Sequence, residues 1–280
     1  MTEADLDGGL RLSRASGWNQ TLGDWRTLLS LGPGLFRVAV RGSDVVASGG
    51  AVCHGEDLAW ICMILVRPDE RGHGLGTRIF DEVLERARAR VTAGRLRVIG
   101  LDATPAGRIL YLKRGFVDGP SLVRLRRAPG TTSTTGGGKP VALTASDLEA
   151  VLVHDRSVFG ADRGPVLREL AHSAPELARV VRDGDRVRCY CFGRHGEQAD
   201  QLGPVVADDE ALARELVLSA LGVPRQRPLI LDARALPRWL AALAELGFRE
   251  ERPLTRMYLG DARPTALPEH ELGILGPEFG

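Results

Sequence analysis

Residues 66–77 read VRPDERGHGLGT, and this stretch determines the fold. It follows an apolar run over residues 59–66, which predicts a buried strand. It leads into a segment whose apolar residues recur every four positions, which predicts an amphipathic helix: Ile79, Val83, Ala87 and Val91. The first amides of a helix have no partner within the helix, and the helix dipole favours an anion beside them. Strand, glycine-bearing loop and helix start together predict a phosphate-binding seat.

The order of the glycines restricts which phosphate ligand fits this seat. A P-loop would end in Gly-Lys-Ser or Gly-Lys-Thr, and a dinucleotide loop would read Gly-x-Gly-x-x-Gly. Residues 71–76 instead read Arg-x-x-Gly-x-Gly. This order resembles the acetyl-CoA loop of the GNAT N-acetyltransferase superfamily. The resemblance implies that acetyl-CoA is the acyl donor and that it contacts Arg71, Gly72, His73, Gly74, Leu75, Gly76 and Thr77.

The order of elements in the first half of the chain matches what the GNAT fold requires, namely antiparallel strands followed by β-α-β-α-β. Turn residues such as those at 41–44 and 55–57 separate the apolar runs. We predict a short strand over residues 10–12, a helix over 21–31, strands over 36–40, 45–53 and 58–66, and, after the motif helix, a strand near 96–101, a helix near 105–114 and a strand near 122–126.

A weak repeat indicates a second domain of the same kind. Residues 110–116 align with residues 242–248, and each segment predicts a helix closed by glycine and phenylalanine before a last strand. We therefore predict an α/β (α+β) protein with mixed, mostly antiparallel sheets and two tandem GNAT-like domains. The expected division is a catalytic domain over 1–128, a flexible linker over 129–140, a degenerate domain over 141–260, and a Pro/Gly-rich tail over 261–280 that is loosely packed or disordered.

The second copy differs where the ligand would bind. Asp208-Asp209-Glu210 stands in place of the arginine and glycines of the first copy, and three carboxylates would repel a pyrophosphate. Leu243 stands in place of Tyr111. We expect the second domain not to bind acetyl-CoA in this manner and to form a wall of the acceptor site instead.

The resemblance also implies roles in catalysis. The backbone of Ile64, Leu65 and Val66 would bind the pantetheine arm, as would Thr104, which replaces the family's usual asparagine. Residues 103–116 resemble the element that carries the family's tyrosine, which makes Tyr111 the predicted general acid for the departing thiolate. The alternative is a tyrosine that only packs on the sheet.

The acceptor site and the general base leave more alternatives open. Trp18, Asn19 and Gln20 fit a polar and aromatic pocket wall, or else a helix N-terminus. Asp162 either faces the acceptor cleft or forms a local Asp–Arg pair. The candidate bases lie in the turn before the third strand, where solvated turn residues are common: His54, Glu56 and Asp57.

Composition excludes several classes of partner. A formal net charge of +1 gives no chain-wide attraction to nucleic acid or to anionic membranes. The four cysteines lack the spacing of a metal site, so we expect structural thiols, no metal and a cytoplasmic protein. No run of apolar residues reaches the roughly 20 that span a bilayer, and the acidic N-terminus does not resemble a signal peptide. We expect a monomer that is a pseudo-dimer, or a homodimer.

The sequence thus predicts an acetyl-CoA-dependent N-acetyltransferase that acts on a primary amine, expected to belong to a small molecule. Direct attack through a ternary complex is favoured, because Cys53 and Cys62 have no evident His and carboxylate partners for a covalent route. Two alternatives remain at this point: a non-catalytic acetyl-CoA sensor or partner-binding module, and a protein or peptide N-acetyltransferase.

Overall fold

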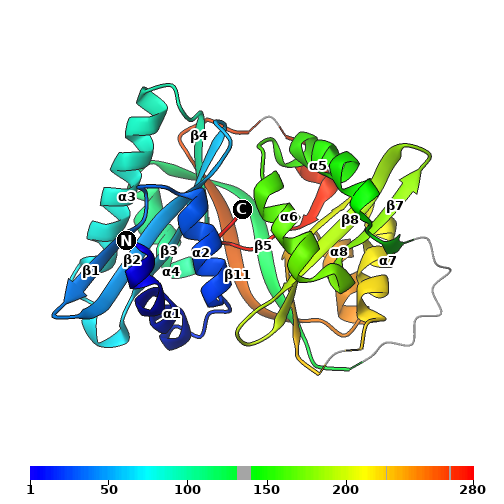
Figure 1. The fold of residues 1–280 in the computed structure, drawn as a ribbon, viewed down its shortest axis with the longest axis horizontal. Coiled ribbons are helices and arrows are strands. Elements are labelled where there is room, and N and C mark those ends of the chain that lie inside the picture. Colours follow the sequence, from blue (N-terminus) through cyan, green and yellow to red (C-terminus); the bar gives the residue numbers. More distant parts are fainter. Residues whose placement is uncertain (131–139, 225, 265) are drawn as a thin grey trace.

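The computed structural model describes residues 1–130, 140–224, 226–264 and 266–280 (Figure 1). Apart from its ends, the predicted linker at 129–140 lies outside the described residues. The α-helices are α1 (Leu6–Ala15), α2 (Leu22–Leu31), α3 (Leu75–Thr92), α4 (Pro105–Leu112), α5 (Ala145–Phe159), α6 (Gly164–Ser173), α7 (Glu210–Leu221) and α8 (Pro237–Glu245). The strands are β1 (Arg37–Arg41), β2 (Asp44–His54), β3 (Leu58–Val66), β4 (Val98–Ala103), β5 (Phe116–Arg127), β6 (Val141–Ala142), β7 (Arg179–Asp183), β8 (Arg186–His195), β9 (Asp200–Ala207), β10 (Leu229–Arg234), β11 (Arg249–Leu259) and β12 (Glu271–Gly273).

The strands of the described residues form one continuous sheet. Its order is β1-β2-β3-β4-β11-β5-β10-β12-β9-β8-β7-β6, so β11 of the second half inserts between β4 and β5, and β5 of the first half pairs with β10. The central ladder between β11 and β5 is antiparallel and runs from the pair Arg249–Arg126 to the pair Leu259–Phe116. Figure 1 shows these two strands crossing the middle of the molecule, with α1 to α4 around one half and α5 to α8 around the other. The predicted fold class, a mixed and mostly antiparallel sheet with flanking helices, is confirmed.

Apolar residues cover both faces of the sheet. The largest cluster joins the two halves, because Trp25 of α2 and Trp60 of β3 belong to the same core as Phe159 of α5 and Phe192 of β8. A second cluster packs α3 against the first half, and a third packs α7 and α8 against the second half. Trp25 is fully buried, and its indole nitrogen donates to the Ser13 hydroxyl at 3.0 Å.

Most of the predicted elements of the first half are present, but the strand at residues 10–12 is wrong. These residues lie within α1, where Leu6, Leu10 and Leu12 face the core. Gly8 and Gly9 of the same helix lie against Val45 and Trp25, so α1 packs closely on its neighbours. A Leu-x-Leu pattern of three residues is too short to distinguish the period of a strand from that of a helix.

The prediction of a loosely packed tail is wrong for its last ten residues. β12 inserts between β10 and β9, and the segment after it is held by buried donors of the sheet and helices. The Trp239 indole donates to the Leu272 carbonyl and the Trp60 indole to the Pro277 carbonyl, both at 3.0 Å. The composition predicted a loose tail because Pro and Gly mark turns, but Leu272, Ile274, Leu275 and Phe279 supply enough apolar surface to order it.

The strand exchange predicts that the first half does not fold alone. A fragment of residues 1–128 lacks β11, so β4 and β5 lose the strand between them and the shared core is exposed. We expect this fragment to be aggregated or to lack a cooperative thermal transition by circular dichroism. Co-expression with residues 140–280 should restore both solubility and cooperative melting. A soluble fragment that melts cooperatively near the full-length temperature would contradict the prediction.

Candidate active site

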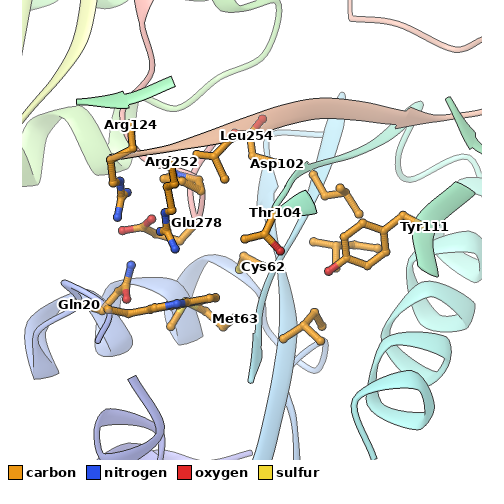
Figure 2. Close-up of a pocket in the computed structure, with 15 residues that line it drawn as sticks. Gln20, Cys62, Met63, Asp102, Thr104, Tyr111, Arg124, Arg252, Leu254 and Glu278 are labelled. Atoms are coloured by element: carbon orange, nitrogen blue, oxygen red, sulfur yellow. The ribbon is translucent and has the colours of Figure 1, made fainter. Parts of the chain in front are cut away.

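A gap between β3 and β4 forms the centre of the site. The two strands pair in parallel only from Leu58–Val98 to Trp60–Gly100, and beyond that point they diverge. The pocket that opens there is lined by residues 61–64 of β3, by Leu101 and Asp102 of β4, and by Thr104, which follows β4 (Figure 2). Strand edges that face a gap offer backbone donors and acceptors that a ligand can use.

A bulge in β3 adjoins this gap. Register with β2 shifts between the pairs Ser48–Leu65 and Gly50–Cys62, and Met63 takes a positive φ of 57°. Bulges of this kind redirect the strand and are common beside active sites. The Ser48 hydroxyl donates to the Met63 carbonyl at 3.0 Å and so satisfies one backbone group of the bulge. Of the three predicted pantetheine-binding residues, Ile64 lines the pocket, while Leu65 and Val66 continue β3 toward the glycine loop.

The glycine loop lies where β3 meets α3. Gly74 precedes the first residue of α3 with φ of 76°, a conformation that favours glycine, and no side chain caps the helix. The first turn of α3 carries no acidic residue, so no side-chain carboxylate competes for its amides, and the exposed Arg71 lies in the loop before it. Below the loop, the buried Glu70 binds Arg41 and Arg67. This geometry is suited to an anion, and the binding roles of residues 71–77 remain predictions.

Tyr111 lies at one end of the pocket. Its ring packs on Phe80 with centroids 4.6 Å apart, and burial raises the pKa of its phenol to about 12. Figure 2 shows the phenol oxygen turned into the pocket. Thr104, also in the pocket, caps α4 by accepting from the Gly107 amide at 3.2 Å. A Cβ added at Gly107 would lie 2.9 Å from the Tyr111 ring, which explains the absence of a larger residue at this position.

Charged residues gather at the other end of the pocket (Figure 2). Gln20, Arg124, Arg252 and Glu278 lie at this end, and Trp18 also belongs to the pocket lining. Arg124 donates from Nε and Nη2 to Asp232 at 2.8 and 2.7 Å, and this pair is buried. Arg194 binds Glu278 and also donates to Asp24 at 2.6 Å, so α2, β8 and the tail together fix the Glu278 carboxylate.

Three of these residues were missed from the sequence: Arg124, Arg252 and Glu278. Nothing local marks Arg124 and Arg252, which reach the pocket only because β5 and β11 exchange between the halves. Glu278 lies in the tail that composition predicted to be loose. The apolar residues Leu272, Ile274, Leu275 and Phe279 were an available signal that this tail packs.

Several predicted site residues lie outside this pocket. Asn19 is buried between the halves, where its Nδ2 donates to the Ala199 carbonyl at 3.1 Å and its Oδ1 accepts from two backbone amides. Asp162 accepts from the Gly164 amide at 2.9 Å at the start of α6 and is not among the residues that line the pocket, while the neighbouring Arg163 binds Asp155. Both residues order backbone rather than substrate.

The three candidate bases also lie elsewhere. His54 is buried, donates from Nε2 to the Phe279 carbonyl at 2.6 Å, and has its pKa lowered to about 4 because burial disfavours the cation. Asp57 binds Arg97, and Glu56 is an exposed turn residue. Their positions in the turn before β3 are as expected, but they do not line the pocket.

The corresponding gap in the second half is closed. β9 and β10 pair in parallel from Asp200–Leu229 to Leu202–Leu231, as β3 and β4 do, but β12 then fills the space between them. The Asp209 side chain caps α7 by accepting from the Leu212 amide at 2.8 Å, so the helix start already holds a carboxylate. Leu243 is fully buried. The second half therefore lacks both the open gap and the uncapped helix of the first.

Metal and membrane features are absent from the part of the chain that the structure describes. It contains no group of His, Cys, Asp and Glu side chains arranged to hold a metal ion, and its four cysteines are free thiols. None of its helices combines the length and the apolar character that crossing a membrane requires. Cys62 lines the pocket, and burial raises the pKa of its thiol well above the usual value.

Comparison with known proteins identifies the family that this chain matches. Two family models, each described as an acetyltransferase (GNAT) domain, match residues 32–118 and 151–271. The chain is 26% identical over 248 residues to holothin acyltransferase of a Pseudoalteromonas species, covering 88% of this chain and 82% of that protein.

Two solved structures share the fold. A presumed acetyltransferase from Pyrococcus horikoshii has a TM-score of 0.79 and 22% identity, covering 100% of this chain and 94% of its own. A tandem GNAT protein from the clavulanic acid biosynthesis pathway has a TM-score of 0.59 and 17% identity, covering 93% of this chain and 95% of its own. At these identities the likeness concerns the fold alone.

The contact between Gly107 and Tyr111 is testable. Alanine is the better helix former by about 1 kcal/mol, yet we expect Gly107→Ala to lower the melting temperature because its methyl group displaces the Tyr111 ring. In a double-mutant cycle, Tyr111→Ala should remove this penalty, so that Gly107→Ala becomes neutral or stabilising in that background. Equal effects of Gly107→Ala in both backgrounds would contradict the contact.

Proposed function

The chain belongs to the GNAT acetyltransferase family and carries two of its domains in tandem, and we propose that its first half transfers an acetyl group from acetyl-CoA to a primary amine of a small molecule. The family implies an acyl-CoA donor; the acetyl group and the acceptor class are the parts we propose. The single observation that carries the proposal is the open gap between β3 and β4, which has Tyr111 in its lining and is bordered by the strand that leads into the uncapped start of α3.

In this proposal the donor occupies the gap along β3. Its phosphates meet the free amides of α3 and the exposed Arg71, while its pantetheine arm pairs with the strand edge near Ile64 and Thr104. A backbone amide beside the bulge at Met63 would bind the thioester oxygen as negative charge develops there. The thioester then lies between Tyr111 and the charged end of the pocket.

The reaction is direct attack by the amine. The amine nitrogen bonds to the thioester carbonyl carbon, the bond from carbon to sulfur breaks, and the nitrogen loses a proton. The departing sulfur receives a proton from the Tyr111 phenol, which regains one from solvent. Because its pKa is raised to about 12, the phenol remains protonated throughout the physiological range and is available as a donor.

The pocket supports direct attack over an acetylated enzyme. Its one cysteine, Cys62, has its pKa raised by burial, whereas a nucleophilic cysteine needs a lowered one. Glu278 is the candidate general base. It lines the pocket, and Arg194 binds only its Oε1. We propose that the Glu278 carboxylate accepts the proton that the amine loses, either directly or through a water molecule.

A small acceptor is favoured because the pocket is walled by both halves. Trp18 and Gln20 come from the first half, Arg252 from β11, and Pro277 and Glu278 from the tail. An extended peptide needs an open groove, whereas this arrangement encloses a compact ligand. The similarity to holothin acyltransferase supports a small-molecule acceptor as well.

Replacing Tyr111 with phenylalanine tests the proposal. The substitution keeps the ring on Phe80 and removes only the proton donor, so kcat should fall about a hundredfold while the Kd for acetyl-CoA stays within twofold. Calorimetry gives the Kd, and release of free CoA with an amine panel gives kcat. An unchanged kcat would reject Tyr111 as the acid. Wild-type protein that binds acetyl-CoA but acetylates no amine would favour a sensor.

A further inference from the structure

Two arginines face each other across the central ladder and enter the same pocket. Arg124 of β5 and Arg252 of β11 are direct cross-strand partners, and both line the pocket at the end opposite Tyr111. Like charges at directly opposed positions destabilise a sheet unless an anion compensates them. The question is therefore which anion each arginine binds.

Arg124 has its anion within the protein, and Arg252 does not. Asp232 binds Arg124 through two hydrogen bonds. Among the described residues, no carboxylate lies within the 4.0 Å of an ion pair with Arg252, and its Nε is buried without a hydrogen-bond partner. Burial, and secondly the charge of Arg124, lower the pKa of Arg252. A guanidinium has five N–H donors, so this group needs acceptors that the protein does not supply.

The nearby carboxylates are each bound by another arginine. Those that act on Arg252 electrostatically are Asp232, Glu251 and Glu278. Asp232 is paired with Arg124, Glu251 with Arg126, and Glu278 with Arg194. These carboxylates offset the charge of Arg252 at a distance but do not accept its hydrogen bonds. Figure 2 shows the Arg252 side chain extending from β11 into the pocket.

A second unpartnered group lies in the same part of the pocket. The side-chain oxygen of Gln20 is buried without a donor and lines the pocket with Arg252. A ligand that satisfies both groups has an anion for Arg252 and an N–H for Gln20. Such a ligand is an amine that also carries an acid.

We propose that the acceptor is an amine bearing a carboxylate, and that Arg252 binds this carboxylate while Gln20 and Glu278 face the amine. The inference rests on the function proposed above and narrows its substrate class. Charge-assisted hydrogen bonds from a guanidinium contribute enough to make an acid roughly ten- to a hundredfold better as an acceptor than its neutral amide.

Matched acids and amides test this directly. The probes are glycine, β-alanine, 4-aminobutyrate and 6-aminohexanoate, each compared with its carboxamide. The variants are Arg252→Gln and, as a control, Arg249→Gln, which removes the same charge from an exposed position on the same strand. The first readout is the rise in melting temperature that each probe causes in protein saturated with CoA, and the second is kcat/KM for acetylation.

We expect at least one acid to raise the melting temperature more than its amide, and the acid to exceed the amide roughly tenfold or more in kcat/KM. Arg252→Gln should abolish both preferences, and Arg249→Gln should keep them. Without ligand, the Arg252→Gln variant should have a melting temperature no lower than that of wild type, because the substitution removes a poorly compensated cation. Equal binding of acids and amides, no response to any acid, or a preference that survives Arg252→Gln would overturn the inference.

Failure of the proposed function would look different. Acetyl-CoA should raise the melting temperature equally in wild type, Arg252→Gln and Arg249→Gln, since Arg252 lies at the acceptor end of the pocket, Arg249 is exposed, and neither belongs to β3 or α3. Absence of that rise in wild type would reject the acetyl-CoA site. If acetyl-CoA raises the melting temperature but acids are not preferred over amides, only the proposal that the acceptor bears a carboxylate is rejected.

Discussion

The pairing of β5 with β11 is the constraint on which the rest of the structure depends. Each strand inserts into the sheet of the other half, so neither half has a finished sheet by itself. Arg256 of β11 reinforces the exchange, because it donates to Asp102 of β4 and to Glu271 of the tail. Buried ion pairs contribute little net stability but make a misplaced strand costly. The exchange also brings Arg124 and Arg252 to the pocket.

The same duplication produces two gaps, of which one is filled. β3 and β4 diverge and leave a pocket, whereas β9 and β10 diverge and receive β12. The tail that closes the second gap continues to Pro277 and Glu278 in the first pocket. One segment of the chain thus fills the second gap and contributes to the lining of the first pocket.

What the sequence predicted well is what neighbouring residues determine. The uncapped helix start after the glycine loop and the acidic start of α7 follow from local spacing, capping and charge, and so does the position of Tyr111 in α4. What it missed depends on contacts between distant residues. Register across the exchanged strands places Arg252, and the indoles of Trp60 and Trp239 order a tail that composition alone describes as loose. Asn19 and Asp162 have the residue types of a polar site but satisfy backbone groups instead.

The most direct test of the account is the number of acyl-CoA sites per chain. Calorimetric titration with acetyl-CoA should give one site, which is lost when Arg71→Glu and Gly74→Asp are combined at the start of α3. Two sites per chain would contradict the closure of the second gap by β12. No binding, or a single site that survives the double substitution, would contradict the assignment of the donor to the gap between β3 and β4.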